Sequence, residues 1–224
     1  MPGFFHHESL YRGPQVVAKL ASLRLAVCGA GAVGSNLAEN LVRQGLAHLR
    51  VIDHDRVEEH NISTQIYDES DAGIWKVEAL RNHLFRACGV EIEPVRKELT
   101  DHNARSLLKD IDLVIDAFDN STSRQAVQHH ARQTKVPCLH AGLFEDYCEI
   151  IWDEQYRVPS EAVNAPAVCD YPLARNIVLL AVAIASETVV QFITDASRVS
   201  RSATLRDFGV RVLDVPILDS LRAR

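Results

Sequence analysis

The sequence has little of what marks several common classes of protein. It contains no Cys-x-x-Cys pair, so a structural zinc site built from four cysteines is excluded by spacing. It has no dense run of Lys and Arg and carries a formal net charge of −6, so we expect no nucleic acid partner. Its five cysteines are odd in number and scattered, and no charged and then apolar segment opens the chain. These absences favour reduced thiols and a cytoplasmic location.

Long uninterrupted apolar runs are also scarce. The most apolar segment, Ile177 to Ile193, is interrupted by Ser186, Glu187, Thr188 and Gln191, which argues against a membrane span. We therefore predict a core helix there and no membrane partner. Apolar residues occupy most of the circumference of this helix, which predicts packing on several sides, by the sheet or by a second subunit. A homodimer is the expected assembly.

The length and the apolar content of the chain are sufficient for one α/β domain. With 224 residues, 47% of them hydrophobic, the chain can bury a sizeable core, whereas two full domains would be cramped. We expect a single domain over residues 1–224. Within it we expect an N-terminal helical arm at 1–22, a mobile crossover loop at 153–170 and a C-terminal tail at 203–224 that ends in an edge strand or hairpin.

A glycine-rich turn between a strand and a helix organises the sequence. Leu25 to Cys28 is a short apolar run typical of a buried parallel strand, and Gly29, Gly31 and Gly34 follow it directly. Apolar residues then recur at helical spacing as far as Gly45. The free N–H groups at the start of such a helix can hold a phosphate. The alternative is a tight turn that uses glycine only for close packing.

An acid follows the next strand at the place where nucleotide-binding folds need one. The strand Leu49 to Ile52 ends at Asp53, about 20 residues past the glycines, where an acid can bind ribose hydroxyls. This arrangement suits both ATP and NAD. An NAD-dependent oxidoreductase is therefore one hypothesis, although no Tyr-x-x-x-Lys pair or comparable hydride-transfer set follows.

The remaining apolar runs predict further strands and helices in alternation. The expected strands are 90–95, 112–116, 138–141 and 147–152, and the expected helices are 75–85, 101–108, 121–134 and 177–193, after an N-terminal amphipathic helix within 1–22. The fold class is thus α/β, with a Rossmann-like, doubly wound, mostly parallel sheet and an antiparallel C-terminal extension. In such sheets ligands bind at the carboxyl ends of the strands, where Asp119 and Asn120 follow the fourth strand.

Taken together, these landmarks resemble the ThiF/MoeB/HesA family. Its members are relatives of ubiquitin-activating enzymes and adenylate the C-terminal carboxylate of ubiquitin-like or sulfur-carrier proteins. The resemblance covers roughly residues 10–193. The residues that match its motifs are Gly29, Gly31, Gly34, Asp53, Asp55, Val57, Asn61, Gln65, Gly73, Lys76, Asp116, Asp119, Asn120 and Arg124.

The resemblance implies ATP and Mg²⁺ as cofactors and gives the matched residues roles. Asp119 would hold the Mg²⁺, and Lys76 would place a point charge on the triphosphate. Asn61 and Gln65 would orient the triphosphate, and Asp53 would bind the ribose hydroxyls. The other residues of the implied nucleotide site are Gly29, Gly31, Gly34, Asp55 and Asn120. Taken singly, Lys76 could be an exposed helix lysine and Asp119 a helix N-cap.

Cys169 stands just before the long apolar helix, where many members of the family keep a cysteine for thioester or persulfide chemistry. We predict that Cys169 is the reactive thiol, because Cys28 and Cys138 fall in buried strand runs. The alternative is a small packing residue at the start of the helix. A ubiquitin-like or sulfur-carrier protein is the expected partner.

The sequence departs from the family pattern at two places. Thr64 stands where the family motif Asn-x-x-Arg-Gln has its arginine, and the N-terminal Arg-Tyr-x-Arg-Gln, from which a second subunit lends an arginine, is replaced by FFHHESLYRG. Arg12 or Arg56 could fill the missing role. Loss of one guanidinium on a phosphate transition state can cost a factor of about 10³ or more. A catalytically weak or inactive scaffold of the same fold, which binds nucleotide or a protein partner, is therefore a further hypothesis.

Overall fold

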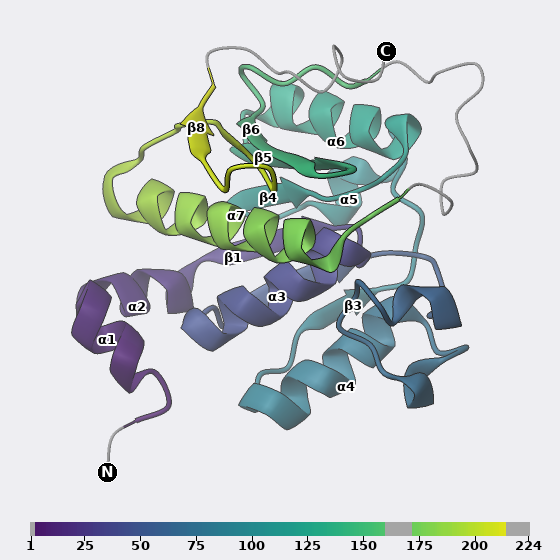
Figure 1. The fold of residues 1–224 in the computed structure, drawn as a ribbon, viewed down its shortest axis with the longest axis horizontal. Helices are drawn as coiled ribbons and strands as arrows, with labels where there is room; N and C mark the ends of the chain where they lie inside the picture. Colours follow the sequence, from purple (N-terminus) through teal and green to yellow (C-terminus); the bar gives the residue numbers. More distant parts are fainter. Residues whose placement is uncertain (1–2, 160–171, 214–224) are drawn as a thin grey trace.

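One eight-stranded sheet forms the centre of the protein (Figure 1). The computed structural model describes residues 3–159 and 172–213. The strand order is β3-β2-β1-β4-β5-β6-β7-β8, parallel from β3 to β5 and antiparallel from β5 to β8. The strands are β1 (Arg24–Cys28), β2 (His48–Ile52), β3 (Glu93–Val95), β4 (Leu113–Asp116), β5 (Cys138–Phe144), β6 (Tyr147–Trp152), β7 (Arg201–Thr204) and β8 (Val210–Val212). The predicted fold class is confirmed.

Helices cover both faces of the sheet and create two apolar cores. The helices are α1 (His6–Arg12), α2 (Pro14–Ser22), α3 (Ala32–Gln44), α4 (Lys76–Cys88), α5 (Ala104–Leu107), α6 (Ser121–Thr134) and α7 (Arg175–Asp195), with the short turns η1 (Glu59–Asn61) and η2 (Glu69–Asp71). The larger core joins one face of the sheet to α3, α4 and α7, and α3 lies beside α7 (Figure 1). The smaller core joins the other face to α5 and α6.

The central strands are apolar because both faces of the sheet are covered. Four of the five residues of β1 and all four of β4 are buried. Asp116, the last residue of β4, is fully buried and is the charged exception in these runs. Short continuous apolar runs were therefore a sound signal for parallel strands in this chain.

The N-terminal arm consists of two helices where the sequence predicted one. Gly13 separates α1 from α2 with φ of +86°, and Pro14 opens α2. A glycine at positive φ followed by a proline favours a break at this point, because proline fixes the start of a new helix. None of the residues of α1 is buried, whereas Leu20 of α2 is fully buried.

The long apolar helix α7 packs against the sheet, as predicted. By length and hydropathy it could cross a membrane, but 56% of its most apolar window is buried inside the protein. It contacts β5, β6 and β7 on the sheet and α2 and α3 beside it. These contacts account for most of its apolar surface, so the part of the prediction that assigned some of that surface to a twin subunit stays a prediction.

Two peripheral segments begin at other residues than the sequence predicted. The third strand comprises Glu93–Val95 only, and it is an edge strand that contains Pro94, which lacks the N–H needed for a central position. The described start of the predicted tail belongs to the hairpin β7–β8, which begins at Arg201, and residues 214–224 lie outside the described part of the chain. Residues 160–171 lie outside the described part of the chain. They include most of the predicted crossover loop and Cys169, so the mobility of the loop and the role of that cysteine stay predictions.

Candidate nucleotide-binding site

The glycine turn joins β1 to α3 with two close backbone contacts. A Cβ atom on Gly34 would lie 1.8 Å from the carbonyl oxygen of Gly29, and one on Gly29 would lie 2.8 Å from the carbonyl oxygen of Ala117. Gly29 also has φ of +98°. A Cβ atom on Gly31, by contrast, would meet nothing within 4 Å. The close-packing alternative therefore explains Gly29 and Gly34 but leaves Gly31 without a packing reason.

The N-terminus of α3 lies open beside Gly31. Gly31 is the N-cap of this 13-residue helix, and no side chain caps it. The first N–H groups of a helix have no partner within the helix, and they carry the positive end of its dipole. An anion placed over Gly31 would accept hydrogen bonds from these groups. The predicted phosphate site is therefore compatible with the local backbone.

Asp53 braces the glycine turn from the end of β2. Its Oδ2 atom accepts a hydrogen bond from the Ala30 N–H at 2.7 Å, and its Oδ1 atom accepts one from the Asp55 N–H at 2.7 Å. Burial raises the pKa of Asp53, although the Lys76 ammonium and the two N–H groups oppose that effect. Tyr67 supports the same turn, because its hydroxyl donates to the Ala30 carbonyl at 2.7 Å. Asp53 therefore orders the loop whether or not it also contacts ribose.

Lys76 is buried, so the alternative of an exposed helix lysine is wrong. It is 8% exposed at the first position of α4, and its Nζ atom lies 2.9 Å from Oδ2 of Asp55. Burial by itself lowers the pKa of Lys76, but the carboxylates of Asp53 and Asp55 outweigh it and hold the pKa above its usual value. The structure thus keeps a charged ammonium beside the glycine turn.

Of the two adjacent residues Asp119 and Asn120, it is Asn120 that caps the following helix. Asn120 is the N-cap of α6, because its Oδ1 atom accepts a hydrogen bond from the Ser123 N–H at 2.8 Å. The N-cap alternative for Asp119 is therefore wrong. Asp119 is exposed, and its carboxylate makes no hydrogen bond to any described residue. It lies two residues beyond Ala117, which contacts Gly29, and its charge acts on Lys76.

Asn61 and Gln65 lie in the polar insertion between β2 and α4, and both are buried. Asn61 closes η1, because its Oδ1 atom accepts a hydrogen bond from the Glu58 N–H at 2.9 Å. The Oε1 atom of Gln65 is buried and has no hydrogen-bond partner among the described residues. A buried acceptor without a partner is costly and is uncommon in native proteins. A ligand with a donor could satisfy it.

Residues 63–66 lie across the start of α3 and bring the insertion to the glycine turn. Asn36 donates from Nδ2 to the Thr64 carbonyl at 2.9 Å, and the Ile66 N–H donates to Oγ of Ser35 at 3.4 Å. The structure therefore gathers the glycine turn, the insertion and the end of β4 at the carboxyl ends of β1, β2 and β4. Of the predicted site residues, Cys169 alone lies outside the described part of the chain.

The two arginines expected to replace the missing one are engaged elsewhere. Arg12 donates to Glu8 at 2.7 Å and to Glu187 of α7 at 2.8 Å. The guanidinium of Arg56 lies 4.0 Å from the centre of the Trp75 ring and donates to the Gly73 carbonyl. Neither contact involves the glycine turn.

The sequence motifs include Asp116 and Arg124 but do not reveal the buried polar layer under α6 to which both belong. His140 lies 2.8 Å through Nδ1 from Oδ2 of Asp116 and 3.2 Å through Nε2 from Oδ1 of Asp153. Arg124 donates to Asp116 at 3.4 Å, and the Tyr156 ring stacks on His140 with 3.8 Å between ring centres. Burial alone would raise the pKa of Asp116, but Arg124 and His140 hold it below its ordinary value. Each charge in the layer thus has a partner of opposite sign.

The polar layer supports the end of β4. A polar stripe on α6 is the only indication of it in the sequence. Oδ1 of Asp116 accepts a hydrogen bond from the Phe118 N–H at 3.2 Å, which fixes the turn that leads to Asp119. In this stripe on α6, Arg124, Gln128 and Arg132 recur every four residues on the face toward the sheet. A polar stripe on a helix that must cover a sheet requires polar partners beneath it.

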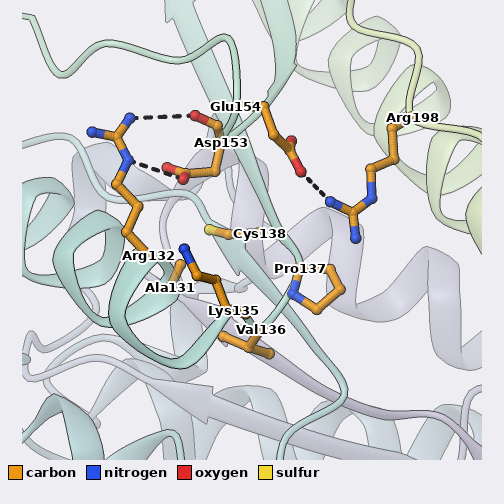
Figure 2. Close-up of a pocket in the computed structure, with 9 residues that line it drawn as sticks. All are labelled: Ala131, Arg132, Lys135, Val136, Pro137, Cys138, Asp153, Glu154 and Arg198. Atoms are coloured by element: carbon orange, nitrogen blue, oxygen red, sulfur yellow. Dashed lines mark hydrogen bonds and ion pairs between the residues drawn. The ribbon is translucent and has the colours of Figure 1, made fainter.

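A cavity lies at the other end of the parallel strands, beside the first residue of β5, and Figure 2 shows the side chains that line it. Its volume is about 370 Å³, and it is lined by Ala131, Arg132, Lys135, Val136, Pro137, Cys138, Asp153, Glu154 and Arg198. Arg132 pairs with Asp153, and Arg198 pairs with Glu154. Burial raises the pKa of the Cys138 thiol well above its usual range, so the cavity holds no activated thiol. The cavity is separate from the glycine turn.

Comparisons with known proteins place the chain in a family. A solved structure of E. coli MccB with AMPCPP and MccA has a TM-score of 0.79, is 16% identical, and covers 94% of this chain and 71% of its own, which shows a shared fold. The sulfur carrier protein ThiS adenylyltransferase of Bacillus subtilis is 30% identical over 66% of this chain and 46% of its own. The SAMP-activating enzyme E1 of Haloferax volcanii is 29% identical over 59% of this chain and 50% of its own.

The chain therefore spans half or less of the length of these two curated relatives. The model of the ThiF family matches residues 8–161, which is more than half of the chain. This match includes the glycine turn, the insertion that follows β2 and the end of β4. The chain belongs to the ThiF family.

Proposed function

We propose that this protein uses ATP to adenylate the C-terminal carboxylate of a ubiquitin-like or sulfur-carrier protein. The observation that carries the proposal is the open N-terminus of α3 over Gly31, which is linked through Asp53 to the charged Lys76. Together these features offer N–H groups and a cation to a row of phosphates.

The reaction needs positioning and charge more than covalent help from the protein. A carboxylate oxygen attacks the α-phosphorus of ATP, the bond between that phosphorus and the bridging oxygen breaks, and pyrophosphate leaves. The N–H groups of α3 would hold the phosphates, Lys76 would offset their charge, and the unpartnered Oε1 atom of Gln65 would accept a donor from the nucleotide or its water shell.

Mg²⁺ fits the residues at the end of β4. The exposed Asp119 carboxylate has no hydrogen bond to a described residue, and Mg²⁺ is usually held by one or two carboxylates together with phosphate oxygens. The ion would supply neutralisation of the charge that develops on the leaving pyrophosphate. Asp119 is the residue we assign to it.

The relatives support the choice of partner. Two of them are named as an adenylyltransferase for a sulfur carrier protein and as an activating enzyme of the E1 kind. The similarly folded MccB is solved with ATP. We extend these properties to this chain as a proposal, and with them a homodimer, a cytoplasmic location and transfer of the acyl group from the adenylate to the thiol of Cys169, which forms a thioester and releases AMP. The four described cysteines are free thiols, in keeping with a reducing compartment.

A weakly catalytic scaffold remains the second candidate because of the charge balance at the site. Asp53, Asp55 and Asp119 supply three carboxylates, whereas Lys76 supplies one ammonium that is already paired with Asp55. Asp53 does not distinguish NAD from ATP, because its two carboxylate oxygens already accept backbone hydrogen bonds and would meet the ribose of either nucleotide in the same way.

Nucleotide preference and pyrophosphate exchange test the proposal in two steps. We expect Mg-ATP to raise the Tm of the protein and NAD to leave it unchanged, because a ligand present at 100 times its Kd stabilises by about 2.7 kcal/mol. We then expect exchange of labelled pyrophosphate into ATP that depends on the carrier protein. Stabilisation without exchange would favour the scaffold. Stabilisation by NAD alone would contradict both candidates.

A further inference from the structure

The described site contains too little positive charge for a triphosphate. Lys76 is paired at 2.9 Å with Asp55, and Asp53 and Asp119 add two more carboxylates nearby. Sites that transfer phosphoryl or adenylyl groups need cations around the phosphates, because charge builds up on the phosphate oxygens in the transition state. If ATP binds as proposed above, a further cation is required.

Arg175 is a cation at the border of this site that the sequence analysis did not identify. It is the first residue of α7, and its Nη1 atom donates to the carbonyl oxygens of Ser63 at 3.3 Å and Gln65 at 3.4 Å. These two residues flank Thr64, whose own carbonyl is bound at 2.9 Å by Asn36 of α3. The guanidinium therefore rests on a segment that is tied directly to the helix beginning at the glycine turn.

The place of Arg175 is unfavourable for an arginine with a purely structural role. The N-terminus of a helix carries partial positive charge, so a cation there is disfavoured. The first turn of α7 contains no acidic residue, and no side chain caps it. Arg175 is exposed and forms no ion pair within residues 3–159 and 172–213. Its two hydrogen bonds are long for N–H to carbonyl contacts, which are usually near 2.9 Å.

Most of the hydrogen-bonding capacity of this guanidinium is also unused. An arginine has five N–H donors, and both hydrogen bonds of Arg175 to described residues come from Nη1. Within the described part of the chain, Nε and Nη2 have no partner. Such a fork of donors matches the geometry of phosphate oxygens, to which arginine often binds through two parallel hydrogen bonds.

We propose that Arg175 is a phosphate-binding residue of this site. Its free donors bind the outer phosphates of the nucleotide, beside Thr64, which offers no charge there. The N-terminal end of α7 thereby forms one wall of the nucleotide site. This assignment rests on the proposed function, because it presupposes that a nucleoside triphosphate is the ligand.

Arg175→Gln tests the assignment through a comparison of ATP with AMP, which lacks the outer phosphates. We expect the Kd for Mg-ATP, measured by calorimetry, to rise about 10- to 100-fold, the range that loss of a charged hydrogen bond gives. The Kd for AMP should change less than about twofold, because its single phosphate lies at α3 and away from Arg175. The Tm without nucleotide should stay the same or rise, since a cation is removed from a helix N-terminus.

Two further variants sharpen the test. Thr64→Arg added to Arg175→Gln should recover Mg-ATP affinity by at least about fivefold, because it returns a guanidinium to the same place. Arg105→Gln is the control, since Arg105 is also exposed in the first turn of a helix, α5, but lies outside the site. It should leave both Kd values unchanged.

The outcomes separate this inference from the proposed function. A wild-type protein that binds neither Mg-ATP nor AMP would overturn the proposed function, and the role of Arg175 would fall with it. A wild-type protein that binds Mg-ATP, with an Arg175→Gln variant of equal affinity, would overturn the role of Arg175 alone. Equal losses for ATP and AMP, a lowered Tm without nucleotide, or a double variant that recovers nothing would also overturn it.

Discussion

Two regions of this protein differ in whether their buried polar groups have hydrogen-bond partners. Under α6, His140 lies between Asp116 and Asp153, and Arg124 binds Asp116 and the Ala141 carbonyl, so every charge has a partner. At the carboxyl ends of β1 and β2, two features instead lack partners, while Asp53 and Lys76 beside them are paired. The Oε1 atom of Gln65 accepts no hydrogen bond from a described residue, and α3 begins without a side-chain cap.

Buried polar groups that bind one another support the fold, whereas polar groups without partners indicate a ligand site. A buried polar layer that satisfies itself can hold strands and helices in one arrangement, and it needs nothing from outside. Polar groups left without partners cost free energy in the unliganded protein, so they are expected where a ligand completes the hydrogen bonds. The contrast supports a site at the glycine turn, although Gln44 and Trp152, elsewhere in the described chain, also carry a buried polar atom without a partner. Each experiment below would break the contrast or sharpen it.

The largest effect is expected at Asp119, the residue that we propose to hold Mg²⁺. Asp119→Ala should lower carrier-dependent exchange of pyrophosphate into ATP by about 10³-fold or more, since the removed carboxylate would hold the ion that neutralises the leaving group. Stability to urea should stay within about 0.5 kcal/mol, because Asp119 is exposed and makes no hydrogen bond to a described residue. Asp195→Ala, at the far end of α7, is the control for exchange only, because the exposed Asp195 carboxylate accepts a hydrogen bond from the Ser197 N–H at 2.9 Å. Undiminished exchange in Asp119→Ala would remove the adenylation mechanism.

A substitution in the polar layer under α6 should have the next largest effect, which is a loss of unfolding free energy. Asp116→Asn removes the charge that Arg124 and His140 share, and breaking a buried pair in this way costs about 3–5 kcal/mol. Asp112→Asn, in the same segment of chain, breaks the half-exposed pair with Arg24 but leaves an oxygen that can still accept from the Arg24 N–H, so it should cost less than about 1 kcal/mol. Urea denaturation measures both. Equal losses would mean that the layer under α6 is no more than a surface network.

The same layer predicts a pH dependence with a definite sign. The pKa of Asp116 is lowered in the folded protein, although burial opposes the effect of Arg124 and His140. Its contribution to stability is therefore fully present above the unfolded aspartate pKa of about 3.9 and is lost as the pH falls through the lower, folded value. The difference in unfolding free energy between wild type and Asp116→Asn should shrink as the pH is lowered from 7 toward 3. A difference that grows on acidification would contradict this assignment.

The same substitution at two glutamines compares the two regions directly. Gln65→Met removes an acceptor that has no partner, so stability without nucleotide should stay equal or rise by up to about 1 kcal/mol, while the affinity for Mg-ATP falls. Gln128→Met removes a side chain that donates to Asp153 at 3.0 Å and to the Tyr156 carbonyl at 3.2 Å, and should cost about 1–3 kcal/mol. Thermal scans with and without Mg-ATP measure both. Changes in stability of the same sign in Gln65→Met and Gln128→Met would contradict the contrast between the two regions.

The sequence predicted the backbone of this protein better than its side-chain contacts. The strands β1, β2 and β4 and the glycine turn were predictable because a parallel strand buried on both faces leaves a short apolar run, and because close backbone approach requires glycine at Gly29 and Gly34. Apolar runs and glycines of this kind can be recognised in a single sequence, because each depends on neighbouring residues only.

Side-chain partners were not predictable, because they come from distant parts of the chain. Asp119 and Asn120 suit an N-cap equally well by pattern, and only the fold shows that Asn120 takes that role. His140 meets Asp116 from the neighbouring strand, and Arg175 meets residues 63–65 from the start of α7. Nothing in the local sequence of His140 or Arg175 indicates which residues they contact.

The contact between Gly29 and Ala117 has a consequence for folding. These residues lie 88 positions apart in the chain, and the parallel pairing of β1 with β4 that brings them together closes a long loop. Closing long loops costs entropy before any contact compensates for it, so pairings of this kind form slowly. A nascent or cleaved chain that ends before β4 therefore contains the whole glycine turn but lacks the backbone that holds it. A nucleotide bound as proposed can stabilise this protein only after the centre of the sheet has assembled.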